Sequence, residues 1–217
     1  MKFLDSLLDL LYPRRRAFCH RISPEGEPVC NACAGKLPYT RGAEQRQRLP
    51  GIPVCISPLY YEGDVRQSLL RYKFGGRREY AKIYGEFLTK CIDENGMSCD
   101  SITWTPLSRK RLRCRGYDQA RLLAEEIAER TGIPCRQLLR KIRNNPAQSG
   151  SGSPEKRRAN VLGVYVCADE EAVRGRQILL VDDIVTTGAT LSECAKILHR
   201  AGAAGVSACT LARTEKR

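Results

Sequence analysis

A chain of 217 residues with 42% hydrophobic and 28% charged residues has the composition of a folded globular protein, which excludes an intrinsically disordered one. Its 37 Lys and Arg residues outnumber its 24 Asp and Glu residues, and the formal charge of +13 favours an anionic partner. No apolar run approaches the ~18 residues of a membrane span, and the eleven cysteines are odd in number and irregularly spaced, so we expect a cytoplasmic protein without membrane insertion and without a secreted disulfide framework.

The first 50 residues look like a small module of their own. Leucines at helical spacing between residues 3 and 11 predict a short amphipathic helix. The loop-rich stretch that follows holds three cysteines among prolines and glycines: Cys19, Cys30 and Cys33. Residues 41–50 are polar and lead into Pro50-Gly51, which predicts a linker. We therefore expect two domains, residues 1–50 and residues 51–217.

From residue 52 the pattern alternates between strand and helix candidates. The apolar run at residues 178–181 is typical of a parallel strand that is covered on both faces. Residues 117–131 form the clearest helix, since their apolar side chains share one face. The other candidates are extended segments at 52–61, 101–105 and 206–211, and helices at 64–72, 77–91 and from residue 190. The alternation predicts an α/β fold with a mostly parallel sheet flanked by helices. The Gly- and Ser-rich residues 144–160 form a long loop, which is usually functional or disordered.

The segment after the apolar strand carries the most chemistry. Two acids, Asp182 and Asp183, end the strand, and a short loop leads into a helix through Thr186, Thr187, Gly188, Ala189 and Thr190. Ligands of an open α/β sheet lie beyond the carboxyl ends of its strands. Backbone N–H groups at a helix N-terminus bind phosphate, whereas carboxylates suit a ribose diol or Mg²⁺. The segment therefore predicts a site for a phosphorylated sugar.

Other strand–loop–helix sites fit this segment less well. A P-loop needs a second glycine and a lysine, and a dinucleotide-binding loop needs two further glycines, all of which are missing. A receiver domain also ends a strand in two acids, but only 34 residues remain after Asp183 for its phospho-acceptor and lysine. A buried strand with a solvated acidic turn is the remaining interpretation.

The middle of the chain is strongly basic. Residues 101–160 hold 14 Lys and Arg against 5 Asp and Glu, a net +9 of the total +13. The densest part, residues 106–119, follows a strand candidate and should lie at the same edge of the sheet as the acid pair. A basic loop there would complete a pocket for pyrophosphate. The alternative, compatible with the first, is a solvated or nucleic-acid-binding surface.

Residues 178–191 resemble the phosphoribosyl-pyrophosphate (PRPP) signature of type I phosphoribosyltransferases: an apolar strand, two acids, and a Thr/Thr/Gly loop before a helix. The resemblance implies that Asp182 and Asp183 hold the ribose hydroxyls of PRPP together with Mg²⁺. It also implies that Thr186 to Thr190 hold the 5′-phosphate.

Nearly the whole chain resembles the ComF family of phosphoribosyltransferase-like proteins, which is associated with DNA uptake in natural competence. Four pieces carry the likeness: the cysteine-bearing N-terminus, residues 61–76 with Lys73, residues 106–120, and the PRPP segment. The resemblance implies PRPP as ligand, and single-stranded DNA and a competence helicase as partners. It assigns six residues to a pyrophosphate loop and the hood above it: Ser108, Arg109, Lys110, Arg115, Gly116 and Gln119.

The chain departs from the family pattern at two places. Tyr117-Asp118 stands where the family commonly has Phe-Asn, and Asp118 would bring a negative charge towards pyrophosphate unless it caps the following helix. Gln148, Arg157 and Asn160 match a later family element, but the leucine expected soon after the glutamine is absent.

The cysteine module is a further departure. The family's N-terminus is a zinc ribbon of two Cys-x-x-Cys knuckles, and here Arg16 replaces the first ligand of the first knuckle. Structural Zn²⁺ takes four ligands, of which three remain: Cys19, Cys30 and Cys33. His20 and Cys55 are candidates for the fourth, and a vestigial ribbon without metal is the alternative.

Two functions remain open at this point. We favour a ComF-like protein that binds PRPP in a Mg²⁺-dependent way and acts in DNA uptake. The alternative is an active phosphoribosyltransferase that releases pyrophosphate and joins the sugar to an unknown base or amine. A PRPP amidotransferase fits poorly, because its glutaminase domain and N-terminal cysteine nucleophile are missing.

Overall fold

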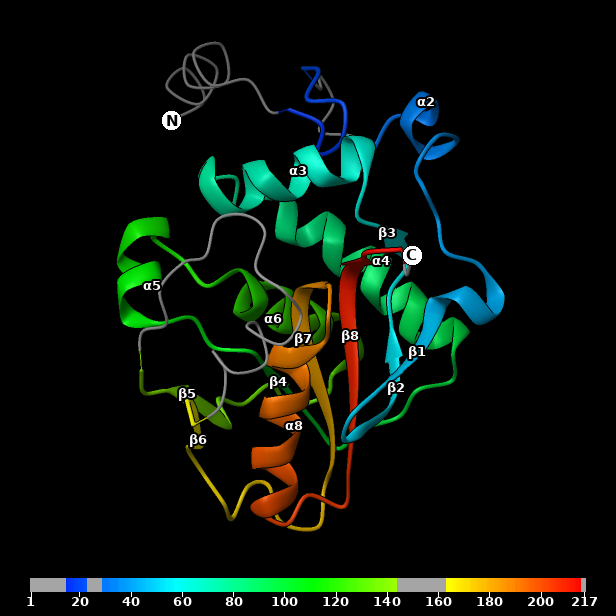
Figure 1. The fold of residues 1–217 in the computed structure, drawn as a ribbon. Coiled ribbons are helices and arrows are strands. Elements are labelled where there is room, and N and C mark those ends of the chain that lie inside the picture. Colours follow the sequence, from blue (N-terminus) through cyan, green and yellow to red (C-terminus); the bar gives the residue numbers. More distant parts are fainter. Residues whose placement is uncertain (1–14, 23–28, 144–162, 216–217) are drawn as a thin grey trace.

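The computed structural model describes residues 15–22, 29–143 and 163–215. The helix expected at residues 3–11, the loop at 144–160 and the family element at Gln148, Arg157 and Asn160 lie outside the described residues. The described chain is an α/β fold in which helices cover both faces of one sheet (Figure 1). The predicted fold class is therefore confirmed.

A six-stranded, mostly parallel sheet forms the centre of the fold. β7 (Gln177–Val185) lies between β4 (Ser101–Trp104) and β8 (Gly205–Arg213), and both pairings are parallel. The extended run predicted at 52–61 consists of two strands, β2 (Ile52–Ile56) and β3 (Leu59–Tyr60), which both pair in parallel with β8. The carboxyl ends of β4, β7 and β8 therefore meet at one edge, where ligands of such sheets bind.

Helices bury the two faces of the sheet separately. On one face lie α3 (Gly63–Phe74), α4 (Tyr80–Glu94) and α6 (Gln119–Thr131), within one core cluster. On the other face α8 (Ala189–Arg200) packs beside a two-stranded hairpin of β5 (Leu139–Lys141) and β6 (Tyr165–Cys167). None of the helices in the described part of the chain combines the length and apolar character that a membrane crossing requires.

The strand β7 shows why its sequence is apolar without interruption. Successive side chains of a strand point to opposite faces. Leu179 and Val181 lie in the core cluster with α3, α4 and α6, whereas Ile178 and Leu180 lie in the cluster with α8. Because both faces of β7 are buried, the strand has no polar side chains between residue 178 and its acid pair.

The prediction of a linker at residues 41–50 was wrong. The segment forms a short 3₁₀ helix, η1 (Gly42–Gln45), and strand β1 (Arg46–Leu49), which pairs antiparallel with β2. Gly51 adopts a φ of +76°, which glycine reaches without strain, and so closes the hairpin. The segment is polar because β1 pairs with β2 alone and is only partly buried.

The basic stretch after β4 is a helix and not the predicted loop. α5 (Arg109–Arg115) begins at Ser108, whose hydroxyl accepts a hydrogen bond from the Arg111 N–H at 3.4 Å. It ends at Gly116, which has a φ of +76°. Ser108 is thus the N-cap of this helix, and the loop residues of the stretch are 105–108 before it and those that begin with Gly116 after it.

Candidate functional site

The acid pair lies at the carboxyl end of β7, as predicted. The Asp183 N–H donates to Asp182 Oδ1 at 2.9 Å, and the Thr105 hydroxyl also hydrogen-bonds the Asp182 carboxyl group. Burial raises the pKa of Asp182 to about 7, and the neighbouring charge of Asp183 adds to this rise. Two adjacent acids in a buried position suit the binding of a cation or of sugar hydroxyls, both of which stabilise carboxylates.

A lysine that the sequence analysis gave no role contacts the acid pair. Lys73 Nζ lies 3.0 Å from Asp183 Oδ1, and the exposed fractions of the two side chains are 18% and 12%. Lys73 is the penultimate residue of α3, far from β7 in sequence. Lys73 lies in a segment that resembles the family, which was a sign that it has a role. Its contact with the acids, however, follows only from the fold.

A second amine approaches from the hairpin. Lys141 Nζ donates to the Tyr165 hydroxyl at 3.2 Å. Burial lowers the pKa of Lys141, and the charge of Arg111 lowers it further, while the charges of Asp182 and Asp118 act in the opposite direction. The sequence analysis missed Lys141 and Tyr165, because nothing in a three-residue strand indicates that its side chains interact electrostatically with Asp182.

The predicted phosphate loop joins β7 to α8 at the same edge. Gly188 is the N-cap of α8 with a φ of +74°, and a Cβ there would lie 2.4 Å from Leu49 Cδ2. Thr187 Oγ1 accepts a hydrogen bond from the Ala189 N–H at 3.4 Å. The first turn of α8 contains no acidic residue, so its N–H groups and the helix dipole favour an anion.

The predicted pyrophosphate and hood residues divide into two groups. Arg109 and Lys110 are exposed on the first turn of α5, whereas Arg115 is half-buried and its Nη1 donates to Gln119 Oε1 at 2.9 Å. Burial lowers the pKa of Arg115, and the charge of Asp183 opposes that shift, so the two groups interact. The structure thus brings Arg115 and Gln119 together, with Arg115 within electrostatic range of Asp183.

Asp118 acts as a helix cap. Its carboxylate accepts hydrogen bonds from the Leu107 N–H at 2.9 Å and from the Arg121 N–H at 3.3 Å, and it is the N-cap of α6. Burial is the main cause that raises its pKa, and these hydrogen bonds oppose the rise. Asp118, where the family commonly has Asn, therefore serves as a helix cap.

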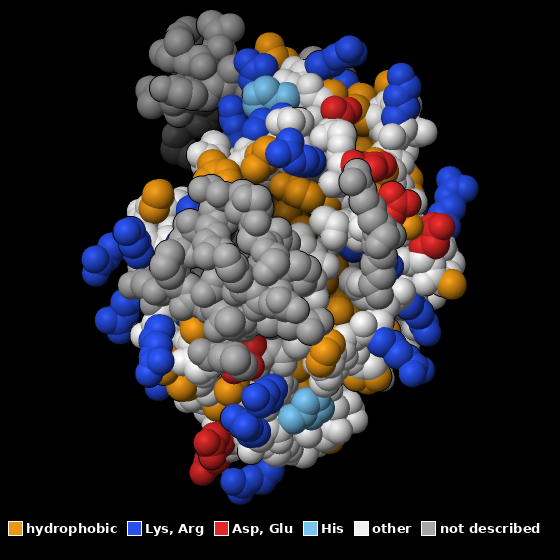
Figure 2. Space-filling view, in the orientation of Figure 1, with side chains coloured by type: hydrophobic (Ala, Val, Ile, Leu, Met, Phe, Trp, Pro, Cys, Tyr) orange, Lys and Arg blue, Asp and Glu red, His pale blue; other side chains and the backbone are white. Residues whose placement is uncertain are grey.

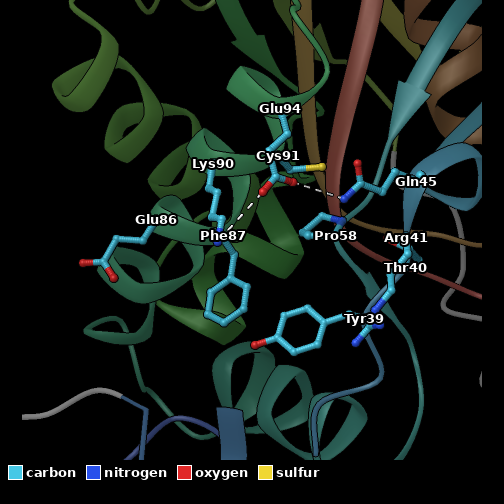
Figure 3. Close-up of a pocket in the computed structure, with 11 residues that line it drawn as sticks. Tyr39, Thr40, Arg41, Gln45, Pro58, Glu86, Phe87, Lys90, Cys91 and Glu94 are labelled. Atoms are coloured by element: carbon cyan, nitrogen blue, oxygen red, sulfur yellow. Dashed lines mark hydrogen bonds and ion pairs between the residues drawn. The ribbon is translucent and has the colours of Figure 1, made fainter. Parts of the chain in front are cut away.

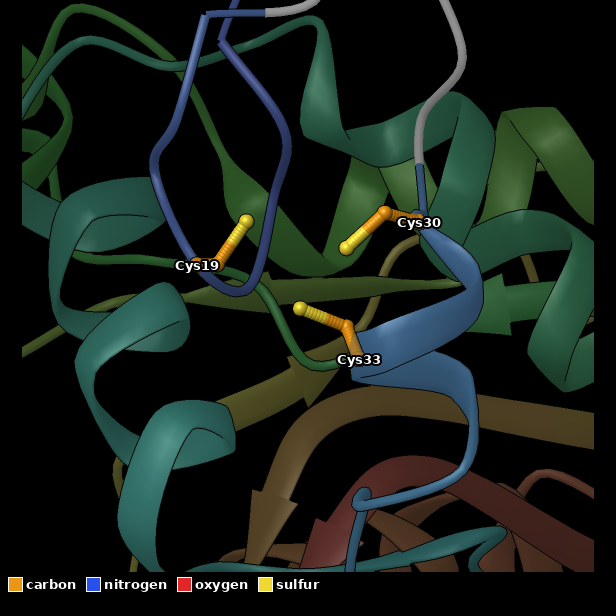
Figure 4. Close-up of side chains that lie close together, drawn as sticks. All are labelled: Cys19, Cys30 and Cys33. Carbon is orange, nitrogen blue, oxygen red and sulfur yellow. The ribbon is translucent and has the colours of Figure 1, made fainter.

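Three of the described cysteines converge. The Sγ atoms of Cys19, Cys30 and Cys33 lie within 4.8 Å of one another (Figure 4). Hydrogen bonds with Cys33 lower the pKa of Cys30 to about 7, whereas burial raises that of Cys33 to about 12. Soft thiolates at this spacing fit Zn²⁺ with one position left for a fourth ligand.

Neither candidate for the fourth ligand belongs to this group of side chains. His20 Nδ1 lies 3.3 Å from the Tyr80 hydroxyl. Cys55 is buried in β2, in the core cluster that contains α8, and burial raises its pKa to about 12. Cys55 was therefore a wrong candidate, because the linker from which it was to fold back is a strand.

The cysteine segment is attached to the rest of the protein through the core. Phe18 is 2% exposed and packs against Tyr84 and Phe87, with ring centroids at 6.2 and 5.7 Å. The Ala17 carbonyl accepts hydrogen bonds from Ser68 Oγ at 2.5 Å and from Arg71 Nη2 at 3.1 Å. The short helix α2 (Asn31–Ala34), which begins at the Cys-x-x-Cys pair, adds Cys33 to the same cluster.

A pocket of about 630 Å³ lies away from the acid pair, between α4 and residues 39–45 (Figure 3). The rings of Tyr39 and Phe87 stack in it with centroids 6.1 Å apart. Glu94 Oε1 pairs with Lys90 Nζ at 3.9 Å, and its other oxygen accepts from Gln45 Nε2 at 3.4 Å. The pocket shares no residue with the acid pair or the phosphate loop.

The fold, with an acid pair and a glycine-containing loop between β7 and α8, is that of a type I phosphoribosyltransferase. The sequence model of the phosphoribosyl transferase domain matches residues 118–217. Similarity to "DNA utilization protein YhgH" of Escherichia coli K12 extends over 207 residues at 32% identity, 90% of this chain and 88% of that protein. For "Competence protein ComFC" of Bacillus subtilis the identity is 30% over 159 residues, 71% of this chain and 62% of that protein.

The chain therefore belongs to the ComF family of phosphoribosyltransferase-like proteins. Similarity to "Competence protein F" of Haemophilus influenzae is 29% over 115 residues, 52% of this chain and half the length of that protein. Among solved structures, the glutamine PRPP amidotransferase from B. subtilis aligns with a TM-score of 0.44 and 23% identity, over 64% of this chain and 30% of that one.

Proposed function

We propose that the chain binds PRPP with Mg²⁺ at the carboxyl edge of β7. The observation that carries the proposal is the juxtaposition, after one strand, of two adjacent carboxylates with the N-terminus of α8. Asp182 and Asp183 hold the ribose hydroxyls and are the oxygen ligands available to Mg²⁺. The loop residues Thr186, Thr187, Gly188, Ala189 and Thr190 hold the 5′-phosphate.

The pyrophosphate group lies on the basic side of the site. Arg115 interacts electrostatically with Asp183 and is hydrogen-bonded to Gln119. Its guanidinium is therefore positioned to bind the pyrophosphate group of PRPP. Arg109 and Lys110 supply further charge from α5, with Ser108 and Gly116 at its two ends. In the free protein Lys73 neutralises Asp183, and Mg²⁺ with PRPP takes over that charge balance.

Calorimetric titration of PRPP with Mg²⁺ tests the proposal. The wild type is expected to bind, and Asp182→Asn/Asp183→Asn to lose binding. The matched control Asp93→Asn/Asp169→Asn makes the same two substitutions at exposed positions and should bind like the wild type. Equal binding by both double variants, or no binding by the wild type, would contradict the site.

A role in DNA uptake is the second part of the proposal. Two relatives, matched by this chain over 88% and 62% of their lengths, carry the names "DNA utilization protein" and "Competence protein". α5 presents exposed Arg109, Lys110 and Arg113, and Figure 2 shows basic side chains gathered over this helix. These basic side chains, which we call the DNA ridge, suit the phosphate backbone of single-stranded DNA. A competence helicase in the cytoplasm is the partner that would deliver the DNA to it.

Binding of a single-stranded oligonucleotide at two salt concentrations tests the DNA ridge. Affinity should fall about 10- to 100-fold between 50 and 200 mM salt. Neutralising Arg109, Lys110 and Arg113 to Gln should weaken binding and flatten this dependence. A control triple change to Gln at Lys36, Lys82 and Lys90, exposed elsewhere, removes the same charge and should have little effect. Similar losses in both variants would show that net charge alone is responsible.

An active phosphoribosyltransferase is the alternative, favoured by the same acid pair and basic helix. Transfer from PRPP needs positioning and charge stabilisation and no covalent nucleophile. Pyrophosphate release in the presence of Mg²⁺, PRPP and a base or amine would establish it, and hydrolysis without acceptor dependence would count against it.

The cysteine group is proposed to hold a structural Zn²⁺. The convergence of Cys19, Cys30 and Cys33 supports this, and the metal would lie in a cysteine segment that packs on the core of the 51–217 domain. Metal analysis of the purified protein should give about one zinc per chain. Cys33→Ser should lose it, whereas Cys114→Ser, at an exposed cysteine on α5, should retain it.

A further inference from the structure

The pocket between α4 and residues 39–45 shares no residue with the proposed PRPP site, and the fold anchors both of its walls (Figure 3). The other wall, opposite α4, runs from Tyr39 to Gln45. The Thr40 N–H donates to the Pro58 carbonyl at 3.0 Å, which ties this segment to the turn before β3. The wall on α4 consists of lining residues that lie on one face of the helix: Glu86, Phe87, Lys90, Cys91 and Glu94.

The two walls are joined at both ends of the pocket. At one end the rings of Tyr39 and Phe87 stack with an interplanar angle of 19°. At the other end Asn95 Nδ2 donates to Gln45 Oε1 at 2.7 Å, and Arg46 Nε donates to Asn95 Oδ1 at 2.6 Å. These contacts hold the hollow of about 630 Å³ open, so a ligand would enter a preformed space.

The floor of the pocket is apolar. Pro58 and Cys91 line the pocket and are buried. Burial raises the pKa of Cys91 to about 12, so its thiol stays neutral and packs as a small hydrophobic group. Together with the rings of Tyr39 and Phe87, this floor suits a flat apolar group of a ligand.

Glu94 is the polar group of the pocket that retains binding capacity. Figure 3 shows its carboxylate between the amide of Gln45 and the ammonium of Lys90. Gln45 Nε2 donates to Glu94 Oε2 at 3.4 Å, and Lys90 Nζ lies 3.9 Å from Glu94 Oε1. Both contacts are long, and 78% of the Lys90 side chain is exposed. A ligand ammonium is therefore able to replace Lys90 at the carboxylate.

The other charged residues of the lining pair elsewhere or face water. Glu86 pairs with Arg130 at 3.5 Å, and Arg41 is exposed. The stacked rings and Glu94 are thus the features that decide what binds. Phe87 and Glu94 are about 10 Å apart along the axis of α4, which matches a phenyl ring joined to an ammonium group by a short alkyl chain.

We propose that this pocket binds a small aromatic amine, with its ring against Tyr39 and Phe87 and its ammonium on Glu94. The two rings supply the contact with a planar group. The carboxylate selects a cation over an anion of the same shape. The site goes beyond the proposed function and does not depend on PRPP binding.

NMR titration with three probes tests the proposal. The first, 4-phenylbutylamine, has both groups; butylamine lacks the ring, and 4-phenylbutanoate carries a carboxylate in place of the ammonium. The aromatic amine should bind and shift the backbone resonances of residues 39–45 and 86–94. Butylamine should bind about 10-fold more weakly, because it buries no ring. The affinity of 4-phenylbutanoate should be about 5-fold lower than that of the amine, because Glu94 repels it.

Matched variants test each half of the site. Glu94→Gln should weaken binding of 4-phenylbutylamine about 2- to 5-fold and remove its advantage over 4-phenylbutanoate. Asp93→Asn, at an exposed acid on the same helix but outside the pocket, should change neither. Phe87→Leu should weaken binding of the amine about 2- to 10-fold. Phe74→Leu, at a 68% exposed ring elsewhere, should leave it unchanged.

The proposal is overturned if 4-phenylbutylamine fails to bind, if it shifts resonances elsewhere, or if its advantage over 4-phenylbutanoate survives Glu94→Gln. Equal binding of the two aromatic probes would assign recognition to Arg41 and Lys90 and would also overturn it. Because 47% of the Glu94 side chain is exposed, Glu94→Gln should fold even where Phe87→Leu does not. PRPP binding by Glu94→Gln should equal that of the wild type, so failure of this site is distinguishable from failure of the PRPP site.

Discussion

At the scale of single residues, the acid pair decides how the edge of the sheet behaves. Asp182 and Asp183 are adjacent in sequence and lie close to each other, with Asp183 buried and Asp182 half-buried. Such a pair is costly to charge unless cations are near. Lys73 is in contact with Asp183, and Lys141 and Arg115 interact electrostatically with the pair. We therefore expect a cation that binds the acid pair to replace the contact between Lys73 and Asp183.

Asp182 should make stability depend on pH. Its pKa is about 7 in the folded protein against an ordinary value of 3.8, so the folded state binds the proton more tightly than the unfolded chain. Its contribution to stability is therefore lost as the pH rises from about 4 to about 7. Asp182→Asn should melt at a higher temperature than the wild type at pH 8, and the difference should shrink at pH 5. Thermal denaturation at both values checks this, and Asp93→Asn should show no such trend.

Lys73 should shift the pH dependence of PRPP binding. The charge of Lys73 lowers the pKa of Asp182, and binding through a carboxylate requires the deprotonated form. Affinity for Mg²⁺ and PRPP should rise between pH 6 and pH 8 in the wild type. In Lys73→Met the midpoint should move to higher pH, whereas Lys90→Met, remote from the acids, should leave it unchanged. If the midpoint is unchanged in both variants, Lys73 has no part in the pH dependence of PRPP binding.

At the scale of elements, the connection from β7 to α8 depends on one glycine. Gly188 requires a positive φ, and its missing Cβ leaves room for Leu49 of β1. The loop that is proposed to bind phosphate is thus held between a helix N-terminus and an edge hairpin. The sequence analysis placed Gly188 in the loop expected to hold the 5′-phosphate, and the structure adds a steric reason for a glycine at this position.

Gly188→Ala should destabilise the protein more than Gly132→Ala. Both glycines have nearly the same φ, +74° and +72°, but a Cβ at Gly132 meets nothing within 4 Å. Gly132→Ala should cost about 1–2 kcal/mol, the strain of the left-handed backbone alone, and Gly188→Ala should cost more. Urea denaturation measures both. Adding Leu49→Ala should recover part of the Gly188→Ala loss; if the two changes merely add, the contact with Leu49 is unimportant.

Elements were predictable where their pattern is local. The apolar β7, the amphipathic α6 and the glycine-containing loop between β7 and α8 follow from side chains a few positions apart. β1 and α5 were assigned wrongly as linker and loop. A partly exposed edge strand is polar, and a seven-residue basic helix has no apolar stripe, so neither carries a periodic signal.

At the scale of the whole molecule, the cysteine segment and the phosphoribosyltransferase domain share one core. Phe18 lies in the same cluster as β7 and α4 residues, and Ser68 and Arg71 hold the backbone around it. The three cysteines are thus close in space to α3, the helix that ends with Lys73 and Phe74. Disturbing the segment should therefore weaken the whole protein.

Phe18→Ala should lower the stability of the entire chain by about 3–5 kcal/mol, the usual cost of emptying a buried aromatic position. The fluorescence of Trp104, the single tryptophan, reports on β4, the strand at the edge of the main sheet that pairs with β7. Its urea midpoint should fall in Phe18→Ala and stay constant in Ile22→Ala, which alters a 53% exposed residue of the same segment. A wild-type midpoint in Phe18→Ala would show that the segment unfolds independently.

The sequence by itself determined the fold class, the family, the acid pair with the glycine-containing loop after it, and the three cysteines, because each of these depends on neighbouring residues along the chain. The tertiary structure decided what surrounds them. Lys73 at the end of α3 contacts Asp183, and Lys141 on β5 and Arg115 on a basic helix interact electrostatically with the acid pair, only because of packing. Cys55 failed as a metal ligand for the same reason: the position of a side chain in space follows from how strands and helices pack, and no local pattern records it.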